Sequence, residues 1–285
     1  MSKINTKVLM SGADYFDDGF AINSYMDDQV PVDVVKATRE HSDIKDCFEK
    51  AGIEVVKVAP PDGCQDGVYT ANWALISGGK AIMSSLPKGR TGEHAYARRS
   101  LEDLGKEIVE LPHNLRFSGQ GDALPCGKYL FVGSEYRTDK ATWPLLARET
   151  GLQVIGVQTI PQLDDSGEPV INPITGWADS FFYDLDLALA VISPTLIAWC
   201  PDAFMPESAK RIRSLRDIDK IEVSLTEAKE GFACNLVSTG NTVIMSDRAP
   251  ELKTALEGSG ITVVTPHVTE LLKGGGFIRC TSLTL

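Results

Sequence analysis

A cysteine close to the C-terminus is the side chain best placed for nucleophilic chemistry. Cys280 ends the run Lys273-Gly-Gly-Gly-Phe-Ile-Arg-Cys280. Glycines let the backbone pass where side chains would clash, and the β-prone residues after them predict a strand that carries the thiol. A thiol held rigidly beside a glycine-rich backbone suits covalent catalysis. The alternative, more common for a lone cysteine, is a buried structural thiol.

Polar side chains recur at the starts of predicted strands along the chain. They are Asp66, Asn72, Ser118, Asp122, Asp184, Asp186, Cys234 and Asn235. Taken singly, each aspartate is more typical of a turn or a helix cap. Strand units arranged around one axis would instead bring them together in a central cavity, with acidic groups facing Cys280. Arg90 and Glu93 begin a predicted helix and could point into the same cavity.

The elements that must position these residues follow a repeated order of hairpin, helix and strand. The turn Ser77-Gly-Gly-Lys80 marks the first hairpin. Helices are predicted over 91–105, 139–150, 206–216 and 249–257, and each leads to a strand. The two ends of the chain supply a fifth unit, in which the strand from Phe277 pairs with Lys7–Ser11, before a helix over 33–50 and a strand over 53–58.

A ring closed by its two terminal strands would keep the C-terminus ordered and remove exposed sheet edges. The repeat period of about 50–60 residues is typical of closed or stacked arrays. An ordinary α/β fold with several hairpins is the alternative. One segment departs from the repeat: residues 161–180 are rich in Pro, Asp and Gly, which predicts a long surface loop that could act as a lid.

Composition narrows the function classes. The chain has 285 residues and a formal net charge of −11, which argues against nucleic acid and anionic membranes as partners. No apolar run approaches the roughly 20 residues that span a bilayer. Six scattered cysteines without a CxxC pair indicate reduced thiols in the cytoplasm. The four histidines lack the spacing of metal ligands, so no metal site is expected.

Seven short stretches, in this order, carry a family resemblance: Phe20–Met26, Asp66–Asn72, Gly119–Leu124, Val132–Thr138, Phe182–Asp186, Cys234–Leu236 and Lys273–Cys280. Nearly end to end, the chain resembles the amidinotransferase and dimethylarginine dimethylaminohydrolase superfamily, also called penteins, and most of all its bacterial arginine dihydrolase branch. The resemblance implies a five-bladed α/β-propeller with pseudo-five-fold repeats, formed as a single domain over residues 1–285. It implies no cofactor.

The resemblance also implies a reaction. A cysteine thiolate attacks the central carbon of a guanidinium, and water or an amine then resolves the covalent adduct. Carboxylates hold the cationic or zwitterionic substrate, and a histidine moves the protons. Cys280 corresponds to the nucleophile, Asp66 and Asp122 to acidic positions, and Asn23, Asn72 and Arg90 to substrate-binding positions. Ser118, Asp186 and Asn235 join the substrate-binding set through their place at strand starts.

Two positions depart from the family pattern. Ser118 stands where the family carries a carboxylate, and Asp184 stands where it carries the catalytic histidine. Because a carboxyl group has a much lower reference pKa than imidazole, Asp184 would act as the acid only if burial or a nearby negative charge raised its pKa. His94 is the alternative acid/base. The remaining histidines, His41, His113 and His267, are expected at the surface or at strand ends.

Two functions follow from this pattern. The first is a Cys280-dependent hydrolase or transferase acting on the C–N bonds of a guanidino or ureido compound. The second is a catalytically silent binding or regulatory protein on the same scaffold, as the missing histidine suggests. Retention of Cys280 and of the polar strand starts favours the enzyme. Self-association into a homo-oligomer stays an open alternative.

Overall fold

The computed structural model describes residues 3–17, 19–23, 25–26 and 30–285. Helices in these residues are short, apart from the first. They are α1 (Val34–Lys50), α2 (His94–Asp103), α3 (Trp143–Thr150), α4 (Pro206–Ser214), α5 (Leu225–Glu230) and α6 (Pro250–Gly258). All but α5 fall on helices that the repeat pattern predicts, within a few residues at each end.

The strands are equally short and form five separate three-stranded sheets. In chain order they are β1 (Lys7–Met10), β2 (Glu54–Lys57), β3 (Ala74–Ser77), β4 (Lys80–Met83), β5 (Glu107–Val109), β6 (Ala123–Cys126), β7 (Tyr129–Val132), β8 (Gln153–Gly156), β9 (Leu189–Ser193), β10 (Leu196–Trp199), β11 (Asp219–Glu222), β12 (Val237–Ser238), β13 (Thr242–Ile244), β14 (Thr262–Val264) and β15 (Leu283–Thr284).

Each sheet repeats one pattern, an antiparallel pair with a third strand added parallel to its middle strand. Four sheets are continuous in sequence: β3-β4-β5, β6-β7-β8, β9-β10-β11 and β12-β13-β14. In the fifth, β15 pairs antiparallel with β1, placing Leu283 opposite Leu9, and β1 pairs parallel with β2. The predicted repeat and the pairing of the two chain ends are therefore confirmed.

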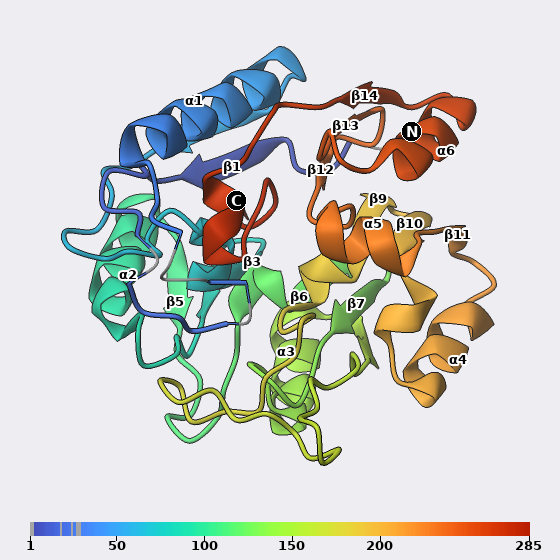
Figure 1. The fold of residues 1–285 in the computed structure, drawn as a ribbon, viewed down its shortest axis with the longest axis horizontal. Coiled ribbons are helices and arrows are strands. Elements are labelled where there is room, and N and C mark those ends of the chain that lie inside the picture. Colours follow the sequence, from blue (N-terminus) through green and yellow to red (C-terminus); the bar gives the residue numbers. More distant parts are fainter. Residues whose placement is uncertain (1–2, 18, 24, 27–29) are drawn as a thin grey trace.

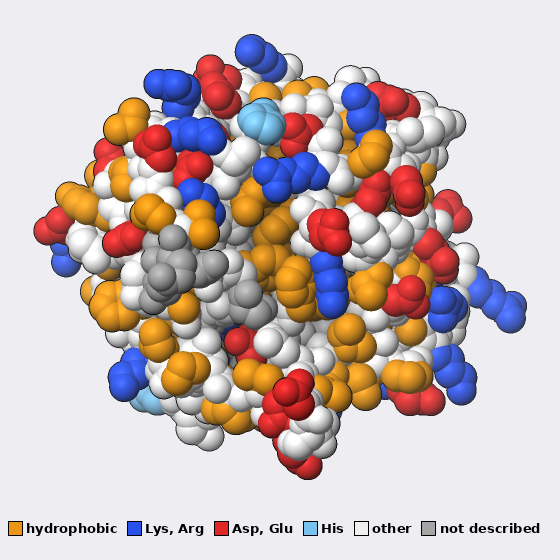
Figure 2. All heavy atoms as spheres, viewed as in Figure 1, with side chains coloured by type: hydrophobic (Ala, Val, Ile, Leu, Met, Phe, Trp, Pro, Cys, Tyr) orange, Lys and Arg blue, Asp and Glu red, His pale blue; other side chains and the backbone are white. Residues whose placement is uncertain are grey.

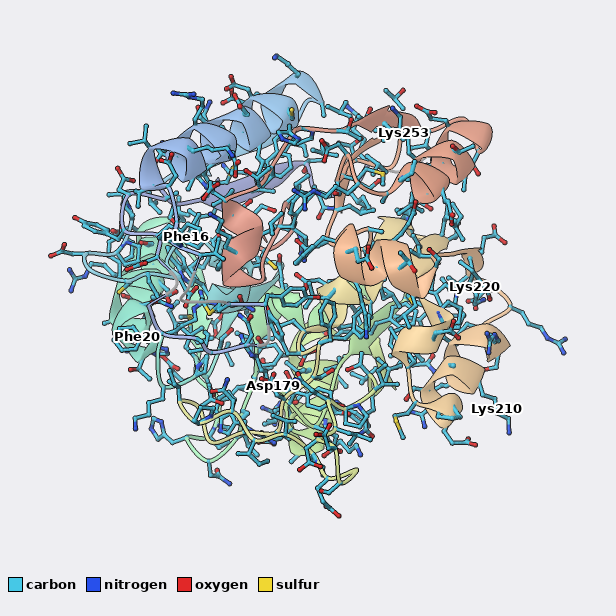
Figure 3. All side chains as sticks on the ribbon, in the orientation of Figure 1. Phe16, Phe20, Asp179, Lys210, Lys220 and Lys253 are labelled. Atoms are coloured by element: carbon cyan, nitrogen blue, oxygen red, sulfur yellow. The ribbon has the colours of Figure 1, made fainter. Side chains whose placement is uncertain are left out.

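The first strands of neighbouring sheets contact one another in order. β15 lies beside β3, β6 beside β9, and β9 beside β12. The amide of Asn5, next to β1, donates to the Ser238 carbonyl at the end of β12 (2.8 Å) and so links the last sheet to the first. Helices α1, α2, α3, α4 and α6 lie outside these strands, whereas the C-terminal segment lies near the middle of the view (Figure 1). Lys210 on α4 and Lys253 on α6 mark this outer layer (Figure 3).

Local sequence explains these elements. Asp33 caps α1 by accepting a hydrogen bond from the Lys36 N–H (3.0 Å), a typical N-cap interaction. Gly151 ends α3 with a φ of 69°, a backbone conformation that favours glycine. Between sheet and helix, α2 buries Ala97 and Leu101 in one apolar cluster with Trp73.

Two strand predictions are wrong. Residues 277–280 form turns instead of a strand: the Thr281 and Ser282 N–H groups donate back to the Phe277 and Arg279 carbonyls, so the chain becomes extended only at β15. Cys280 thus precedes the strand that was expected to carry it. The first hairpin strand also begins late, because Thr70–Trp73 form a 3₁₀ turn.

The segment predicted as a surface loop, 161–180, has no helix and only isolated bridges, such as Ile171 with Ala178. Its tip is exposed, but Asp179, labelled in Figure 3, is buried. The Asn172 side chain donates to the Ala21 carbonyl (3.2 Å) and so connects the segment to the stretch that precedes α1.

The distribution of surface charge agrees with the prediction that nucleic acid and anionic membranes are not partners. Acidic and basic side chains are both scattered over the face in Figure 2, without a continuous basic patch. Among the residues that the structure describes, none of the helices has the length and apolar character required to cross a bilayer.

Candidate active site

Short 3₁₀ turns position several of the polar side chains. Asn72 lies in the turn Thr70–Trp73, and Asp186 lies in the turn Leu185–Leu187; each turn directly precedes or adjoins the first strand of a sheet. A third turn, Gly119–Gly121, contacts both of them. The polar residues assigned to strand starts therefore sit one turn earlier, where backbones from different sheets meet.

The Cys280 thiol lies in this region and is 3% exposed. Its Sγ donates to Asp186 Oδ2 (3.4 Å) and accepts from Asn235 Nδ2 (3.1 Å). Asn235 Oδ1 accepts the N–H groups of Arg279 (3.0 Å) and Cys280 (3.2 Å), so Asn235 holds both the backbone and the sulfur of the cysteine. Burial, together with the carboxyl groups of Asp186 and Asp184, raises the pKa of the Cys280 thiol well above its usual value.

The preceding glycines are required by close contacts. A Cβ on Gly276 would lie 2.9 Å from the Cβ of Cys280 and 2.4 Å from the ring of Tyr69. Gly275 has a φ of 81°, and a Cβ there would lie 2.7 Å from Asn23 Oδ1. The Asn23 amide donates to the Gly274 carbonyl (2.9 Å), so its described contacts position the glycine run.

Asp184 occupies the position expected for a histidine. Hydrogen bonds through Asn72 connect it to Ser118, which occupies the position expected for a carboxylate. Asn72 Nδ2 donates to Asp184 Oδ2 (2.7 Å) and to Ser118 Oγ (3.0 Å). Asn72 Oδ1 accepts from Arg90 Nη1 (2.8 Å). The carboxylate at 184 and the hydroxyl at 118 thus share one amide group.

Arg90 is buried with its charge balanced. Its guanidinium donates to both carboxylate oxygens of Glu93 (2.8 Å each) and to the carbonyls of Asp66 (3.0 Å) and Tyr69 (3.1 Å), in addition to Asn72. Glu93 also accepts from the Trp73 indole (2.9 Å). The substrate-binding role of Arg90 stays a prediction; in the structure its guanidinium nitrogens donate to protein groups, and the hydrogen bond to Asn72 connects it to the site.

The carboxyl groups around Cys280 lack such a balance. Asp122 Oδ1 accepts the Leu185 N–H (3.0 Å), but the Oδ1 atoms of Asp184 and Asp186 are buried without a hydrogen-bond partner in the described structure. Burial and the neighbouring Asp184 raise the pKa of Asp122 to about 7 and the pKa of Asp186 well above its usual value. Buried acids this close to one another cannot all be ionised without a cation.

Asp66 is a further buried acid. Burial raises its pKa to about 6, although Arg90 acts in the opposite direction, and its Oδ1 has no hydrogen-bond partner in the described residues. Its other oxygen accepts from the Gln65 amide (3.1 Å). Asp66 is therefore buried as Asp184 and Asp186 are, and likewise leaves an acceptor unused.

Two side chains were missed from the sequence. Arg137 is buried, stacks on the Tyr183 ring (4.1 Å to its centroid) and makes one hydrogen bond, to the Ile22 carbonyl (3.0 Å). Tyr25 packs on Phe181 with ring centroids 4.1 Å apart, and its buried hydroxyl has no partner within the described residues. Both lie in stretches that carry the family resemblance, which was the available signal.

The histidines do not supply an acid. His94 is 37% exposed and contacts Glu110 (3.4 Å) in a surface hollow that Cys280 does not line. His113 and His267 are exposed, as expected, but His41 is buried on the inner face of α1, contrary to the prediction. In the described part of the chain, no three His, Cys, Asp or Glu side chains are arranged to hold a metal ion.

Comparison with curated proteins finds two kinds of relative. The bifunctional arginine dihydrolase/ornithine cyclodeaminase AgrE of Nostoc sp. is 29% identical over 282 residues, which are 97% of this chain and 37% of that protein. The chain thus spans a little over a third of that relative's length. The N(G),N(G)-dimethylarginine dimethylaminohydrolase of Mycobacterium tuberculosis is 30% identical over 273 residues, covering 95% of this chain and 83% of that protein.

Solved structures show the same fold. The N-terminal domain of ArgZ, a cyanobacterial arginine dihydrolase, was crystallised with its substrate; it superposes with a TM-score of 0.85 at 28% identity and 97% coverage of both chains. A dimethylarginine dimethylaminohydrolase from Pseudomonas aeruginosa, complexed with citrulline, has a TM-score of 0.77 at 17% identity and full coverage of both chains, which establishes the shared fold alone. The family model described as N,N dimethylarginine dimethylhydrolase, eukaryotic, matches residues 21–285, so the chain belongs to the dimethylarginine dimethylaminohydrolase family.

Proposed function

We propose that this protein is a cysteine-dependent hydrolase, or an amidinotransferase, that cleaves a C–N bond of an arginine-like guanidino or ureido compound. One observation carries the proposal: the Cys280 thiol is buried beside carboxyl groups that make no salt bridge with any of the described residues. A planar cation would supply the positive charge and the hydrogen-bond donors at once, because guanidinium groups pair with carboxylates through two parallel N–H donors.

The scaffold we propose is a single domain over residues 1–285, a five-bladed α/β-propeller in which each three-stranded sheet is one blade. The cyclic contacts between the sheets and the similarity to the ArgZ domain support this arrangement. The first strand of each sheet would then lie nearest the axis. The turns Thr70–Trp73 and Leu185–Leu187, together with the turn Gly119–Gly121 that contacts both, would surround the end of that axis where the substrate reacts.

We assign the cation site to Asp184 and Asp186, with Asp66 as a further carboxylate. Asp184 replaces the missing carboxylate at Ser118, because the Asn72 amide bridges the two positions within 3.0 Å. Their unpartnered oxygens would accept guanidinium N–H groups. The substrate would enter as the cation that lowers the pKa of the Cys280 thiol, so the thiolate forms when the substrate is bound.

In the reaction, the Cys280 thiolate attacks the guanidinium carbon, and a new C–S bond forms. The leaving amine takes one proton and departs as the C–N bond breaks. Water then adds to the adduct carbon, gives up a proton, and expels the thiolate. We assign the proton transfers to Asp184, whose Oδ1 has no donor among the described residues, with Asp122 beside it able to hold a proton near neutral pH.

The other end of the substrate would meet Arg137. Its guanidinium has a single hydrogen bond and no salt bridge among the described residues. A buried arginine in this state favours a carboxylate partner, and the α-carboxylate of an amino-acid substrate has the required charge. The free thiols of the described cysteines agree with a cytoplasmic protein.

A substrate panel tests the proposal. Guanidino and ureido compounds are assayed for release of ammonia, urea and amine, with Cys280→Ala as the control and Cys126→Ala as a matched buried thiol. We expect turnover that Cys280→Ala abolishes and Cys126→Ala retains. Turnover that persists in Cys280→Ala would refute the mechanism. Saturable binding without turnover of any compound would instead identify a silent binding protein.

A second variant tests the departure from the family. Asp184→His introduces the histidine that the family resemblance implies at this position. If Asp184 performs the proton transfers for a different substrate, the variant changes which compound turns over. If the protein is silent for lack of a histidine, the variant gains activity that the parent protein lacks.

A further inference from the structure

A cavity that Cys280 does not line reaches Asp186. Its volume is about 250 Å³, and Asp186, Arg279 and Gln120 line its polar end. Neither Cys280 nor Asp184, Asn72 or Asp66 lines it. The cavity lies along the first strands β3, β6 and β9; Gln120 and Asp186 line it from two of the 3₁₀ turns, and Asn5 and Thr284 also line it.

Most of the wall cannot hydrogen-bond to water. Apolar side chains of the first strands line it, including Ile76, Leu124, Leu189 and Val191, together with Leu236, which directly precedes β12. The volume is far above the roughly 10–15 Å³ that one water needs. A cavity of this size and lining suits a small organic molecule with an apolar body.

The polar end holds an uncompensated charge. The Arg279 side chain is 7% exposed, and its described partners are neutral: Nη2 donates to Gln120 Oε1 (2.7 Å) and Nη1 donates to Thr284 Oγ1 (2.9 Å). No salt bridge to Arg279 occurs in the described residues. A buried guanidinium with neutral partners is costly unless an anion joins it.

Asp186 lines the same end of the cavity but makes neither a salt bridge nor a hydrogen bond to Arg279 in the described residues. Its Oδ2 accepts from the Cys280 thiol, and its Oδ1 is buried without a partner among those residues. Burial and the neighbouring Asp184 raise the pKa of Asp186 well above its usual value, which makes Asp186 a weaker counter-ion for Arg279. The Arg279 guanidinium is therefore the group in this cavity that suits a carboxylate partner.

We propose that this cavity is a binding site for a small monocarboxylic acid with an apolar body, held by Arg279. Its occupancy acts on the nucleophile. Asn235 Oδ1 accepts the backbone N–H groups of both Arg279 and Cys280, and Asp186 contacts the Cys280 sulfur, so a ligand that shifts Asp186 or the backbone at Arg279 shifts the thiol. The site is thus an effector site that adjoins the proposed substrate site at Asp186.

Calorimetric titration of the intact protein tests the site with three acids, 4-methylpentanoate, benzoate and phenylacetate, and with the corresponding uncharged amides. At least one acid should bind with a Kd below about 1 mM, and its amide should bind at least about tenfold more weakly because it lacks the charge that pairs with Arg279. Failure of all three acids, or equal binding of acid and amide, would overturn the proposal.

Variants locate the binding. Val191→Phe fills the cavity without removing any bond of Arg279 and should abolish binding, whereas Val35→Phe on the exposed face of α1 should retain it. Arg279→Gln should remove the preference for the acid over the amide. Arg137→Gln should leave the affinity unchanged, since Arg137 lies outside this cavity. Acid binding that survives Val191→Phe or is lost in Arg137→Gln would place the ligand elsewhere and refute the site.

Coupling to Cys280 is measured by its rate of alkylation with iodoacetamide, which requires neither substrate nor turnover. A saturating acid should change this rate by at least about fivefold, the lower end of ordinary coupling between sites. The same acid should have no effect in Val191→Phe. An unchanged alkylation rate in the parent protein at saturation would refute the effector role, and this outcome is independent of whether the protein hydrolyses a guanidino compound.

Discussion

Two buried polar clusters lie side by side and differ in one respect, the balance of charge. In the first, Arg90 pairs with both oxygens of Glu93 and also donates to backbone carbonyls and to Asn72. In the second, around Cys280, Asp184 and Asp186 make no salt bridge with any residue that the structure describes, and their Oδ1 atoms have no hydrogen-bond partner there. Asn72 belongs to both clusters and joins them.

The difference in charge balance indicates a structural role for the first cluster and a catalytic role for the second. In a buried ion pair whose hydrogen bonds are all satisfied, no donor or acceptor remains for a ligand. We therefore expect the Arg90 cluster to hold Asn72 in position. A cluster of buried acids without a cation stays less stable than it could be until one arrives. A cationic substrate would remove the unfavourable interaction among these buried acids. The same acids that lower the stability of the unliganded protein would then favour substrate binding.

The largest expected effect comes from removing the proton carrier in the unbalanced cluster. Asp184→Asn keeps the size and the hydrogen bond to Asn72 but cannot transfer a proton, so we expect kcat to fall by about 10²- to 10⁴-fold. The free energy of unfolding should stay level or rise, since one buried acid is removed. Steady-state kinetics and urea unfolding measure the two quantities. A lower stability with unchanged kcat would reverse the roles assigned to the clusters.

The balanced cluster should respond in the opposite way. Glu93→Gln leaves the Arg90 guanidinium buried without its counter-charge, and we expect a loss of about 3–5 kcal/mol in the free energy of unfolding. Urea unfolding measures it, with Glu102→Gln, on the exposed side of α2, as the control. If Glu93→Gln costs no more than Glu102→Gln, the Arg90–Glu93 pair does not support the site.

The fold was largely predictable because the order of hairpin, helix and strand repeats along the sequence. Turn glycines such as Gly78 and a helix C-cap at Gly151 marked the element ends, and the same order recurred in each unit. The pairing of β15 with β1 followed from the same repeat. The strand at Cys280 was wrong because local β propensity lost to the turns that bring the thiol to Asn235 and Asp186.

The site was predictable in its members and less so in their roles. The sequence indicated which polar residues would gather, but not that Arg90 would be used up by Glu93 or that Asn23 and Asn235 would hold backbone. These outcomes depend on hydrogen-bond geometry between segments far apart in sequence. Arg137 and Tyr25 escaped notice because a single arginine or tyrosine has no pattern of its own; only burial without partners makes them stand out.

The pH dependence of stability should report the unbalanced cluster. The pKa of Asp122 is raised to about 7 and that of Asp66 to about 6, above the values near 3.9 in an unfolded chain. Between about pH 4 and pH 7 the folded state therefore holds more protons, so the free energy of unfolding falls as pH rises, by up to about 1.4 kcal/mol per pH unit for each group.

Urea unfolding at pH 5, 6, 7 and 8 measures this slope. Asp122→Asn should flatten it, because the amide is neutral at every pH and resembles the protonated acid. A stability that rises from pH 5 to pH 8 in the parent protein would mean that the acids are ionised and neutralised in the folded state, and the contrast between the two clusters would disappear.

The smallest expected effect comes from substitution of Ser118. Variants at this position show whether the Ser118 side chain takes part in binding or only fills space. Among the described residues its Oγ accepts from Asn72 alone (3.0 Å), and Asn72 keeps Asp184 Oδ2 as a second acceptor at 2.7 Å. Ser118→Ala should therefore cost about 0.5–1.5 kcal/mol in stability, the usual value for one neutral hydrogen bond, and change kcat/KM by less than about tenfold.

Ser118→Glu, which restores the family carboxylate, should instead destabilise the apo protein by adding an acid to the unbalanced cluster, and should regain stability when a guanidinium compound is added. Unfolding with and without arginine measures this. Equal effects of the two variants would mean that position 118 lies outside the field of the acids, and that the replacement of its carboxylate by Asp184 is not the reason for the serine.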